Sequence, residues 1–350
     1  MADLSTFDPN SVGLTSNNIF GLPFSEEDAE LVLLPVPWEV TISYRDGTSR
    51  GPEHIFNASL QIDLYDPDMT DAWKRGICML PIDKEMRTKS DYKRQCAELI
   101  IRHLEDGGIV TENEYLTGKL KEVNESCAWM VGKVQEQVAA LLKKGKKVGL
   151  VGGDHSTPLG FIKALTEYHK DFGILQIDAH ADLREAYENF TYSHASIMYN
   201  VLKEVPQVSK LVQVGIRDYC DEELVMIRQN PQRVSTWFDK EIKERQYEGI
   251  TWKSICKNII DELPEKVYIS FDIDGLDPKL CPNTGTPVPG GFELEQVFYL
   301  FKLLHESGRQ LIGFDLNEVS TGQQNTDGID NIVGARALYK MCNFMLGNGR

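Results

Sequence analysis

Short apolar runs alternate along the chain with longer segments whose apolar positions follow helical spacing. Between Cys127 and Lys144, for example, apolar residues stand at positions 131, 134, 138, 141 and 142, which places them on one face of a helix. Strands are predicted to begin near residues 31, 76, 148, 172, 211, 267 and 311, and helices to cover residues 52–62, 90–104, 127–144, 158–168, 293–305 and 331–346. This alternation predicts an α/β fold with a central parallel sheet that helices cover on both faces.

The first 28 residues differ from the rest of the chain. Residues 1–28 are polar and rich in Asn, Ser and Asp, with isolated apolar residues such as Phe20, Leu22 and Phe24. From residue 29 onwards no internal repeat, low-complexity tract or Pro/Gly/Ser-rich linker interrupts the alternation of strands and helices. We therefore expect an N-terminal extension over residues 1–28 and a single domain over residues 29–350.

The composition indicates which ligands the protein can bind and in which cellular compartment it is expected. The 350 residues include 37 Lys and Arg against 53 Asp and Glu, so the formal net charge is -16. Such a chain repels nucleic-acid phosphates and favours a cationic or neutral ligand. The N-terminus has neither a basic start nor a long apolar run, and the seven cysteines stand singly without a Cys-x-x-Cys pair. These features predict a cytoplasmic protein with reduced thiols and no membrane span.

Three short motifs place six metal-ligand residue types directly after predicted strands. The motifs are Gly-Gly-Asp-His at 152–155, Asp-Ala-His-Ala-Asp at 178–182 and Asp-Ile-Asp at 272–274, and the six residues are His155, Asp178, His180, Asp182, Asp272 and Asp274. Alternate side chains of an extended segment point to the same side. One such motif alone is an ordinary turn after a strand. Three of them at strand ends, where open α/β sheets place their sites, predict a common metal centre.

The ligand types also indicate the metal. Four carboxylates in one cleft repel one another, and two divalent cations would offset that repulsion. Carboxylates with a minority of imidazoles and no thiolate suit manganese, nickel, cobalt or iron better than a structural zinc. We expect two divalent ions, with Mn²⁺ as the first candidate and Ni²⁺ as the alternative.

His194 and Glu318 complete a set of groups that suits hydrolysis. His194 lies twelve residues beyond Asp182, and Glu318 follows a predicted strand. Their structural alternatives are a core or surface histidine and a solvated loop carboxylate. Two metals make a shared water more acidic, a histidine can shuttle a proton to the leaving group, and a glutamate can pair with a planar cation. A guanidinium substrate would use all three.

The remaining histidines lie in helical runs away from the motifs and are expected to be structural. They are His54, His103, His169 and His305.

The motifs together resemble those of the arginase/agmatinase (ureohydrolase) family, and agmatinases in particular. The resemblance covers roughly residues 30–346 and rests on Ser-Tyr-Arg-Asp-Gly-Thr-Ser-Arg-Gly-Pro, Gly-Gly-Asp-His-Ser, Asp-Ala-His-Ala-Asp-Leu-Arg, Tyr-Ser-His-Ala-Ser, Ser-Phe-Asp-Ile-Asp-Gly-Leu-Asp-Pro and Gly-Thr-Pro-Val-Pro-Gly-Gly. It implies a three-layer α/β/α arginase-like fold and a homo-oligomer, as a trimer or hexamer. It also implies hydrolysis of a small cationic guanidino compound to urea plus an amine, without nucleic-acid or membrane partners.

The resemblance assigns a role to each candidate residue. One metal would be held by His155, Asp178, Asp182 and Asp274, and the other by His180, Asp178, Asp182 and Asp272. His194 matches the proton-shuttling histidine, Glu318 the glutamate that binds the guanidinium, and Asp182 joins them as a catalytic residue. Glu223 falls where a glutamate would recognise the distal amine. His194 and Glu318 are thus expected to touch substrate.

Departures from the family pattern bear on the substrate. Cys220 stands where arginases carry an aspartate for the α-amino group, and residues 183–192 replace the loop that contacts the α-carboxylate. Agmatine is therefore expected ahead of arginine. Free guanidine, in a nickel-dependent reaction, and a guanidino acid such as 4-guanidinobutyrate are the alternatives. Trp38, Tyr187 and Tyr192 are candidates to close a small pocket.

Two other readings of the motifs are less consistent with the residues. A zinc deacetylase of the histone-deacetylase type uses one metal, fewer carboxylates and a tandem His pair, which six ligands in three motifs do not match. A catalytically silent member retained for protein interaction should lack at least one of the eight chemical residues, and none is missing.

Overall fold

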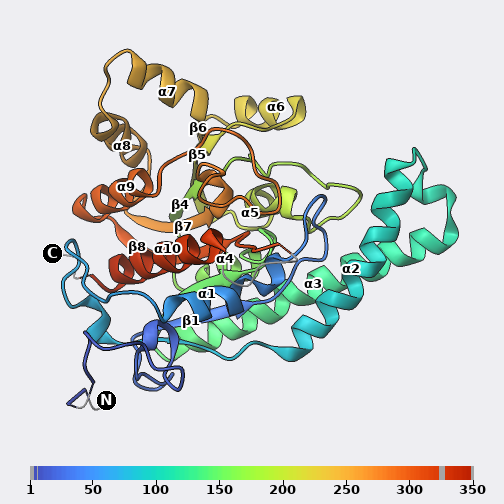
Figure 1. The fold of residues 1–350 in the computed structure, drawn as a ribbon. Helices are drawn as coiled ribbons and strands as arrows, with labels where there is room; N and C mark the ends of the chain where they lie inside the picture. Colours follow the sequence, from blue (N-terminus) through green and yellow to red (C-terminus); the bar gives the residue numbers. More distant parts are fainter. Residues whose placement is uncertain (1–3, 6, 323–327, 348–350) are drawn as a thin grey trace.

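Eight parallel strands form the central sheet of the computed structural model, which describes residues 4, 5, 7–322 and 328–347 (Figure 1). Along the sheet the strands follow the order β2-β1-β3-β8-β7-β4-β5-β6. Their bounds are β1 (Leu31–Val36), β2 (Ile77–Met79), β3 (Lys147–Gly152), β4 (Phe172–Ile177), β5 (Val208–Ile216), β6 (Val234–Phe238), β7 (Lys266–Asp272) and β8 (Gln310–Asn317). The parallel sheet that the sequence predicts is confirmed.

Helices cover both faces of this sheet. They are α1 (Gly51–Ser59), α2 (Lys84–Glu105), α3 (Glu114–Lys143), α4 (Leu159–Leu165), α5 (Ile197–Glu204), α6 (Asp221–Gln229), α7 (Asp239–Tyr247), α8 (Trp252–Asp261), α9 (Leu294–Glu306) and α10 (Ile329–Leu346). Alternate residues of β1 belong to different apolar clusters, because neighbouring side chains of a strand point to opposite faces. Leu31 and Leu33 pack with α1, α8, α9 and α10, whereas Val32 and Leu34 pack with α2, α3, α4 and α5. The result is a three-layer α/β/α arrangement.

Two helices extend further than the apolar pattern predicts. The expected starts at residues 90 and 127 are replaced by starts at Lys84 in α2 and Glu114 in α3. The side chains of Asp83 and Asn113 accept hydrogen bonds from the backbone N–H groups of the first turns, so they cap these helices. Figure 1 shows α2 and α3 running side by side, with the end of α2 and the start of α3 reaching beyond the sheet.

The strand β6 and helices α5 to α8 were not among the predicted elements. In β6 only Val234 is fully buried, and the other four residues are partly exposed. A strand at the edge of a sheet lacks the continuous apolar run that marks a central parallel strand. The helices between β4 and β7 are short, at eight to ten residues each, and α7 carries mostly charged side chains.

The segment before β1 packs against the body of the protein. Phe20 and Leu22 are buried in the same cluster as α1 and α10. The N–H of Phe20 donates to the Ser59 hydroxyl (2.9 Å), and the N–H of Met79 donates to the Asn18 side chain (2.8 Å). The division into an extension over residues 1–28 and a domain over 29–350 stays a prediction. Within the described ranges, none of the helices combines the length and the apolar character that crossing a membrane requires.

The four central strands end beside one another. In the order β3, β8, β7, β4 their carboxyl ends lead directly into Gly152-Gly153-Asp154-His155, Glu318, Asp272-Ile273-Asp274 and Asp178. Parallel strands present all their carboxyl ends at one edge of the sheet, and neighbouring strands present them side by side. Motifs that lie more than 160 residues apart in sequence, such as His155 and Glu318, therefore meet at one place.

Candidate active site

A buried histidine and three carboxylates form the first part of the site. Nδ1 of His155 lies 3.0 Å from Oδ2 of Asp178, 3.1 Å from Oδ2 of Asp182 and 3.3 Å from Oδ2 of Asp272. His155 and Asp178 are almost completely buried. A single ring nitrogen has one site for a proton or a ligand, so it cannot satisfy three carboxylates by hydrogen bonding. Within the described part of the chain Nδ1 makes no hydrogen bond of acceptable geometry.

A second histidine shares one of these carboxylates. Nδ1 of His180 lies 3.0 Å from Oδ2 of Asp274 and 3.7 Å from Oδ1 of Asp178. Asp178 thus turns one oxygen toward His155 and the other toward His180. Potential ligand atoms gather in two groups, His155 with Asp178 and Asp182, and Asp178 with His180 and Asp274. All six residues that the sequence predicts as ligands therefore lie together.

A hydrogen-bond chain behind His155 decides which of its nitrogens faces the carboxylates. The Ser270 hydroxyl donates to Oδ1 of Asp315 (3.0 Å), so its oxygen is left to accept from Nε2 of His155 (2.9 Å). With the proton on Nε2, Nδ1 presents a lone pair to three carboxylates. That arrangement is repulsive without a cation and suits a metal ion, so the residues fit the ions that the sequence predicts.

Asp178 is held by a second chain that crosses three strands. The Thr236 hydroxyl donates to Oε1 of Gln213 (2.8 Å), and Nε2 of Gln213 donates to Oε1 of Gln176 (2.7 Å). Nε2 of Gln176 in turn donates to Oδ2 of Asp178 (2.8 Å). Gln176 and Gln213 are fully buried, so these bonds have no competition from solvent. The chain fixes the orientation of the carboxylate that both ligand groups share.

The carboxylates of this cluster need positive charge. Burial and the charge of Asp178 together raise the pKa of Asp182 to about 7. Burial and the neighbouring Asp274 likewise raise the pKa of Asp272 well above its usual range. The same carboxylates hold the pKa of His155 well above its usual value, although burial opposes this. The cluster is therefore built to take up cations, either protons or metal ions.

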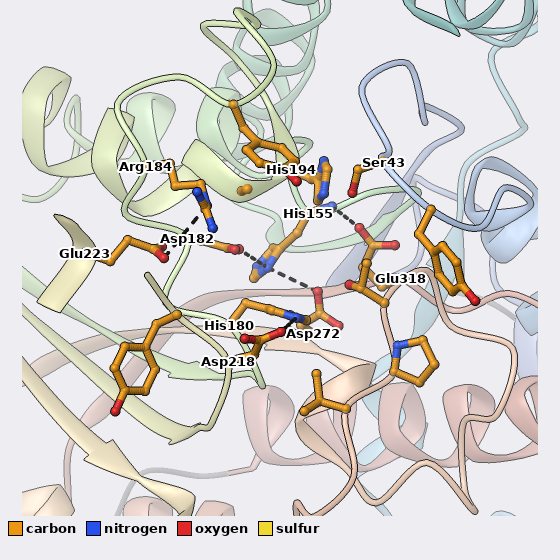
Figure 2. Close-up of a pocket in the computed structure, with 17 residues that line it drawn as sticks. Ser43, His155, His180, Asp182, Arg184, His194, Asp218, Glu223, Asp272 and Glu318 are labelled. Atoms are coloured by element: carbon orange, nitrogen blue, oxygen red, sulfur yellow. Dashed lines mark hydrogen bonds and ion pairs between the residues drawn. The ribbon is translucent and has the colours of Figure 1, made fainter. Parts of the chain in front are cut away.

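The cluster lies at the base of a cavity of about 260 Å³ (Figure 2). Glu318 lines the wall, with Oε1 accepting from the N–H of His155 (2.9 Å). Its other oxygen, Oε2, is buried and accepts no hydrogen bond from the residues that the structure describes. The backbone of Glu318 has a φ of 62°, held by a bond from its N–H to the Gly153 carbonyl (2.8 Å). This uncommon conformation keeps an unpaired carboxylate oxygen at the wall of the cavity.

His194 lines the same cavity from the start of a short 3-10 helix, η5 (His194–Ser196). Its ring meets the ring of Tyr187 edge-on, with centroids 6.1 Å apart. Burial and the nearby His180 together lower the pKa of His194 to about 3. The imidazole is therefore neutral at pH 7 and able to accept a proton.

Glu223 lies on the cavity wall, but its carboxylate is already engaged. Oε1 accepts from the N–H of Leu183 (3.0 Å) and Oε2 from the N–H of Cys220 (2.9 Å), which caps the start of α6. Cys220 itself does not line the cavity. Of the three aromatic residues expected to close the pocket, Tyr187 lines it, whereas Trp38 and Tyr192 lie outside the lining. Trp38 is fully buried in the core instead.

The structure adds two charged residues that the sequence reasoning missed. Arg184 and Asp218 both line the cavity (Figure 2). Oδ2 of Asp218 lies 4.0 Å from Nε2 of His180. Arg184 follows the motif at 178–182, but Asp182 has a φ of 54°, so the extended alternation stops there and spacing alone could not have placed Arg184 in the cavity. The expectation that arginine is disfavoured rested on Cys220 and on the replaced loop at residues 183–192, and Arg184 of that loop lines the cavity.

Comparison with known proteins identifies the family. A model of the arginase family matches residues 29–343. The chain belongs to the arginase family. This arginase-family chain is 30% identical over 298 residues to the N(1)-aminopropylagmatine ureohydrolase of Thermus thermophilus, with 85% of each chain covered. It is 28% identical over 337 residues to the agmatinase of Neisseria meningitidis, with 94% of this chain and 93% of that one covered.

Solved structures share the arginase fold with this chain. The agmatine ureohydrolase of Thermoplasma volcanium superposes with a TM-score of 0.68 at 22% identity, covering 92% of both chains. Arginase from Bacillus cereus gives a TM-score of 0.63 at 19% identity, covering 91% of this chain and 99% of that one. The predicted three-layer arginase-like fold and the predicted ureohydrolase family are confirmed. The arginase-family chain is therefore a hydrolase with a candidate metal centre at the carboxyl edge of its sheet.

Proposed function

We propose that this chain hydrolyses the guanidino group of a small substrate to urea and an amine, using two divalent ions. The observation that carries the proposal is the pair of His–carboxylate groups that share Asp178 at the base of a cavity. The ions would be held by His155, Asp178, His180, Asp182, Asp272 and Asp274. When bound, they would polarise the guanidinium carbon and make a water molecule more acidic.

The chain's own residues supply binding and proton transfer. The unpaired Oε2 of Glu318 is placed to accept N–H groups of a guanidinium, an interaction that a planar cation makes well. Asp182 is placed to accept a proton from the attacking water. The neutral His194 is placed to carry a proton to the nitrogen that leaves. Together these roles break the bond between the guanidinium carbon and the substrate chain.

Agmatine is the first substrate to test, because curated relatives are named for agmatine and aminopropylagmatine. Manganese is the first metal and nickel the second, since the oxygen and imidazole donors suit both. The preference for agmatine over arginine stays a prediction. So do the cytoplasmic location, the homo-oligomer, as trimer or hexamer, and the exclusion of nucleic-acid and membrane partners.

Urea release from a panel of guanidines tests the proposal. The metal-free protein is loaded with Mn²⁺ or with Ni²⁺, and urea is measured with agmatine, free guanidine, 4-guanidinobutyrate and arginine at equal concentration. Urea from agmatine supports the proposal, and urea from guanidine with Ni²⁺ alone would favour the nickel-dependent alternative. Release of no urea with either metal would contradict it and favour a silent family member.

Replacing Glu318 with Gln is expected to lower kcat/KM for every guanidine by roughly tenfold to a hundredfold. An amide cannot neutralise a guanidinium, and the charge-assisted bond is lost. Bound metal, measured by elemental analysis, should be unchanged because Glu318 belongs to neither ligand group. Glu293→Gln, at an exposed position on the surface, is the matched control. Unaltered kinetics in the Glu318 variant would place its carboxylate outside the binding site.

A further inference from the structure

Residues 39–49 lie between β1 and α1, and Ser43 of this segment lines the same cavity as His194. Up to residue 47 the segment forms neither helix nor strand, so other contacts must fix its position. It closes on itself at Glu39, whose Oε2 accepts from two N–H groups of the same segment (2.7 and 3.0 Å). Figure 2 shows Ser43 at the end of the cavity where His194 lies.

Helix α2 holds this segment with three side chains on one face. Arg87, Ser90 and Arg94 are spaced by three and four residues, which aligns them along one side of a helix. Nη2 of Arg87 donates to the carbonyl of Ser49 (2.8 Å), and the Ser90 hydroxyl accepts from the N–H of Glu39 (3.0 Å). These two bonds fix the ends of the segment, and its middle is left to Arg94.

Arg94 binds the backbone next to His194. Its Nη1 donates to the carbonyls of Val40 (3.4 Å) and Ile42 (2.5 Å), which flank Thr41. The backbone of Thr41 in turn hydrogen-bonds the imidazole of His194, and this bond raises the pKa of His194 against the larger effect of burial. The guanidinium therefore fixes the two carbonyls on either side of the residue whose backbone contacts His194.

Arg94 also faces a second loop that contacts His194. Glu188 lies in that loop, and burial raises its pKa to about 7, although the positive charge of Arg94 opposes this. Among the described residues neither Oε2 of Glu188 nor Nε of Arg94 has a hydrogen-bond partner, and Glu98 lies 3.5 Å from Nε as an ion pair. Tyr187, which precedes Glu188, packs edge-on against the ring of His194. The side chain of Arg94 is only 15% exposed, so water screens its attraction for Glu188 weakly.

Resting on the function proposed above, we propose that Arg94 is a positioning residue that acts through His194. It holds the backbone at residues 40–42 and the loop of Glu188 against the imidazole, and so keeps the proton-transferring ring in one place. Arg94 neither lines the cavity nor belongs to a ligand group, so it is not placed to touch substrate or metal. Proton transfer depends on the distance between donor and acceptor, so a loosened ring would lower kcat more than it raises KM.

A double-mutant cycle with His194 tests this proposal in the metal-loaded enzyme. Arg94→Met, which keeps a long apolar stem, should lower kcat for the guanidine that is hydrolysed fastest by at least about tenfold and change KM by less than about threefold. In the His194→Ala background the same exchange should lower kcat by less than about twofold, because the group that it positions is already absent. Equal losses in both backgrounds would show that Arg94 only supports the fold and would overturn the proposal.

Two further variants control for charge and for folding. Arg102→Met is the matched control, because Arg102 lies on the same helix, is 72% exposed and also pairs with Glu98. It should leave kcat unchanged. Arg94→Lys, which can still donate to a carbonyl, should recover part of the kcat that Arg94→Met loses. Should Arg94→Met not fold, Arg94→Lys in the two backgrounds carries the same comparison.

Hydrogen exchange of peptides that cover residues 39–49 gives a readout that needs no activity. Exchange there should rise at least about fivefold in Arg94→Met and stay unchanged in Arg102→Met, because only Arg94 binds this backbone. Unchanged exchange in Arg94→Met would overturn the proposal. If the unmodified enzyme releases urea from none of the guanidines, the proposed function fails, whereas raised exchange in Arg94→Met would still support the hold of Arg94 on this segment.

Discussion

Asp178→Asn is expected to lose bound metal and at least about a thousandfold in kcat/KM, or about 4 kcal/mol of transition-state stabilisation. Asp178 is the one carboxylate that belongs to both ligand groups, and it turns a different oxygen toward each histidine. An amide of the same shape supplies no negative charge to hold two cations close together. Both oxygens of Asp178 accept hydrogen bonds, so the amino group of Asn would face a donor in either orientation, the Gln176 amide or the backbone N–H of His180.

Elemental analysis and urea assays on the same preparation check this expectation, with circular dichroism to confirm folding. Asp261→Asn, an exposed carboxylate in α8, is the matched control and should keep both metal and activity. A fully metal-loaded Asp178→Asn enzyme with normal turnover would contradict the proposal that two metal ions share Asp178.

His194→Ala is expected to slow turnover by roughly a hundredfold or more, which is the usual contribution of a positioned acid or base. Burial keeps the pKa of the imidazole low, so the neutral ring is available to take a proton at pH 7. His194 lines the cavity but belongs to neither ligand group. Metal content and thermal stability should therefore stay near those of the unmodified protein.

The His194 experiment needs a control for the loss of an aromatic ring. His169→Ala removes a partly buried histidine that packs against Phe172 and lies outside the cavity. Only the His194 variant should lose activity, and small proton donors such as imidazole added to the assay should restore part of it. Loss of metal from His194→Ala would show that the residue is a ligand and that its assigned role is wrong.

The sequence was most informative where apolar runs are continuous. Buried central strands such as β4 and β7 are mostly apolar, so the apolar run itself marks the strand. The edge strand β6 has one exposed side and a mixed composition, and it gave no comparable signal. The beginnings of α2 and α3 were missed because few of their residues are buried, namely Met86 in the first turns of α2 and Leu116, Val123 and Ser126 in those of α3. Only their capping residues, Asp83 and Asn113, mark where the helices begin.

The ligand cluster could be predicted from the sequence, whereas the residues that surround and orient it could not. Each of its motifs lies directly after a strand, and parallel strands bring their carboxyl ends together. Gln176 orients Asp178 from two residues away, but other residues that orient the site come from distant parts of the chain. Ser270 lies 115 residues from His155, and Gln213 lies 37 residues from Gln176. Such pairs depend on strand order and register, which local pattern does not reveal.

For Glu223 the sequence predicted the position of the residue but not its contacts. Its position on the cavity wall agrees with the expectation of a substrate-binding glutamate. Its role depends on the two backbone N–H groups that its oxygens accept, and those contacts follow from how residues 183 and 220 meet in space. The amine-binding role of Glu223 stays a prediction, whereas its role in holding the start of α6 is evident.

The chain of side chains from Thr236 to Asp178 has a polarity. Gln213 and Gln176 each receive a hydrogen on their oxygen and pass one on from their nitrogen, so every dipole points the same way. Glutamate, the nearest isostere of glutamine, has no hydrogen to donate when ionised, so a single Gln→Glu exchange would interrupt the chain of hydrogen bonds at that link. The direction in which the Thr236 hydroxyl of β6 donates therefore matches the direction in which Asp178, two strands away, accepts. Strand β6 contributes no residue to the cavity, but its Thr236 is linked through two glutamines to Asp178, the carboxylate that both ligand groups share.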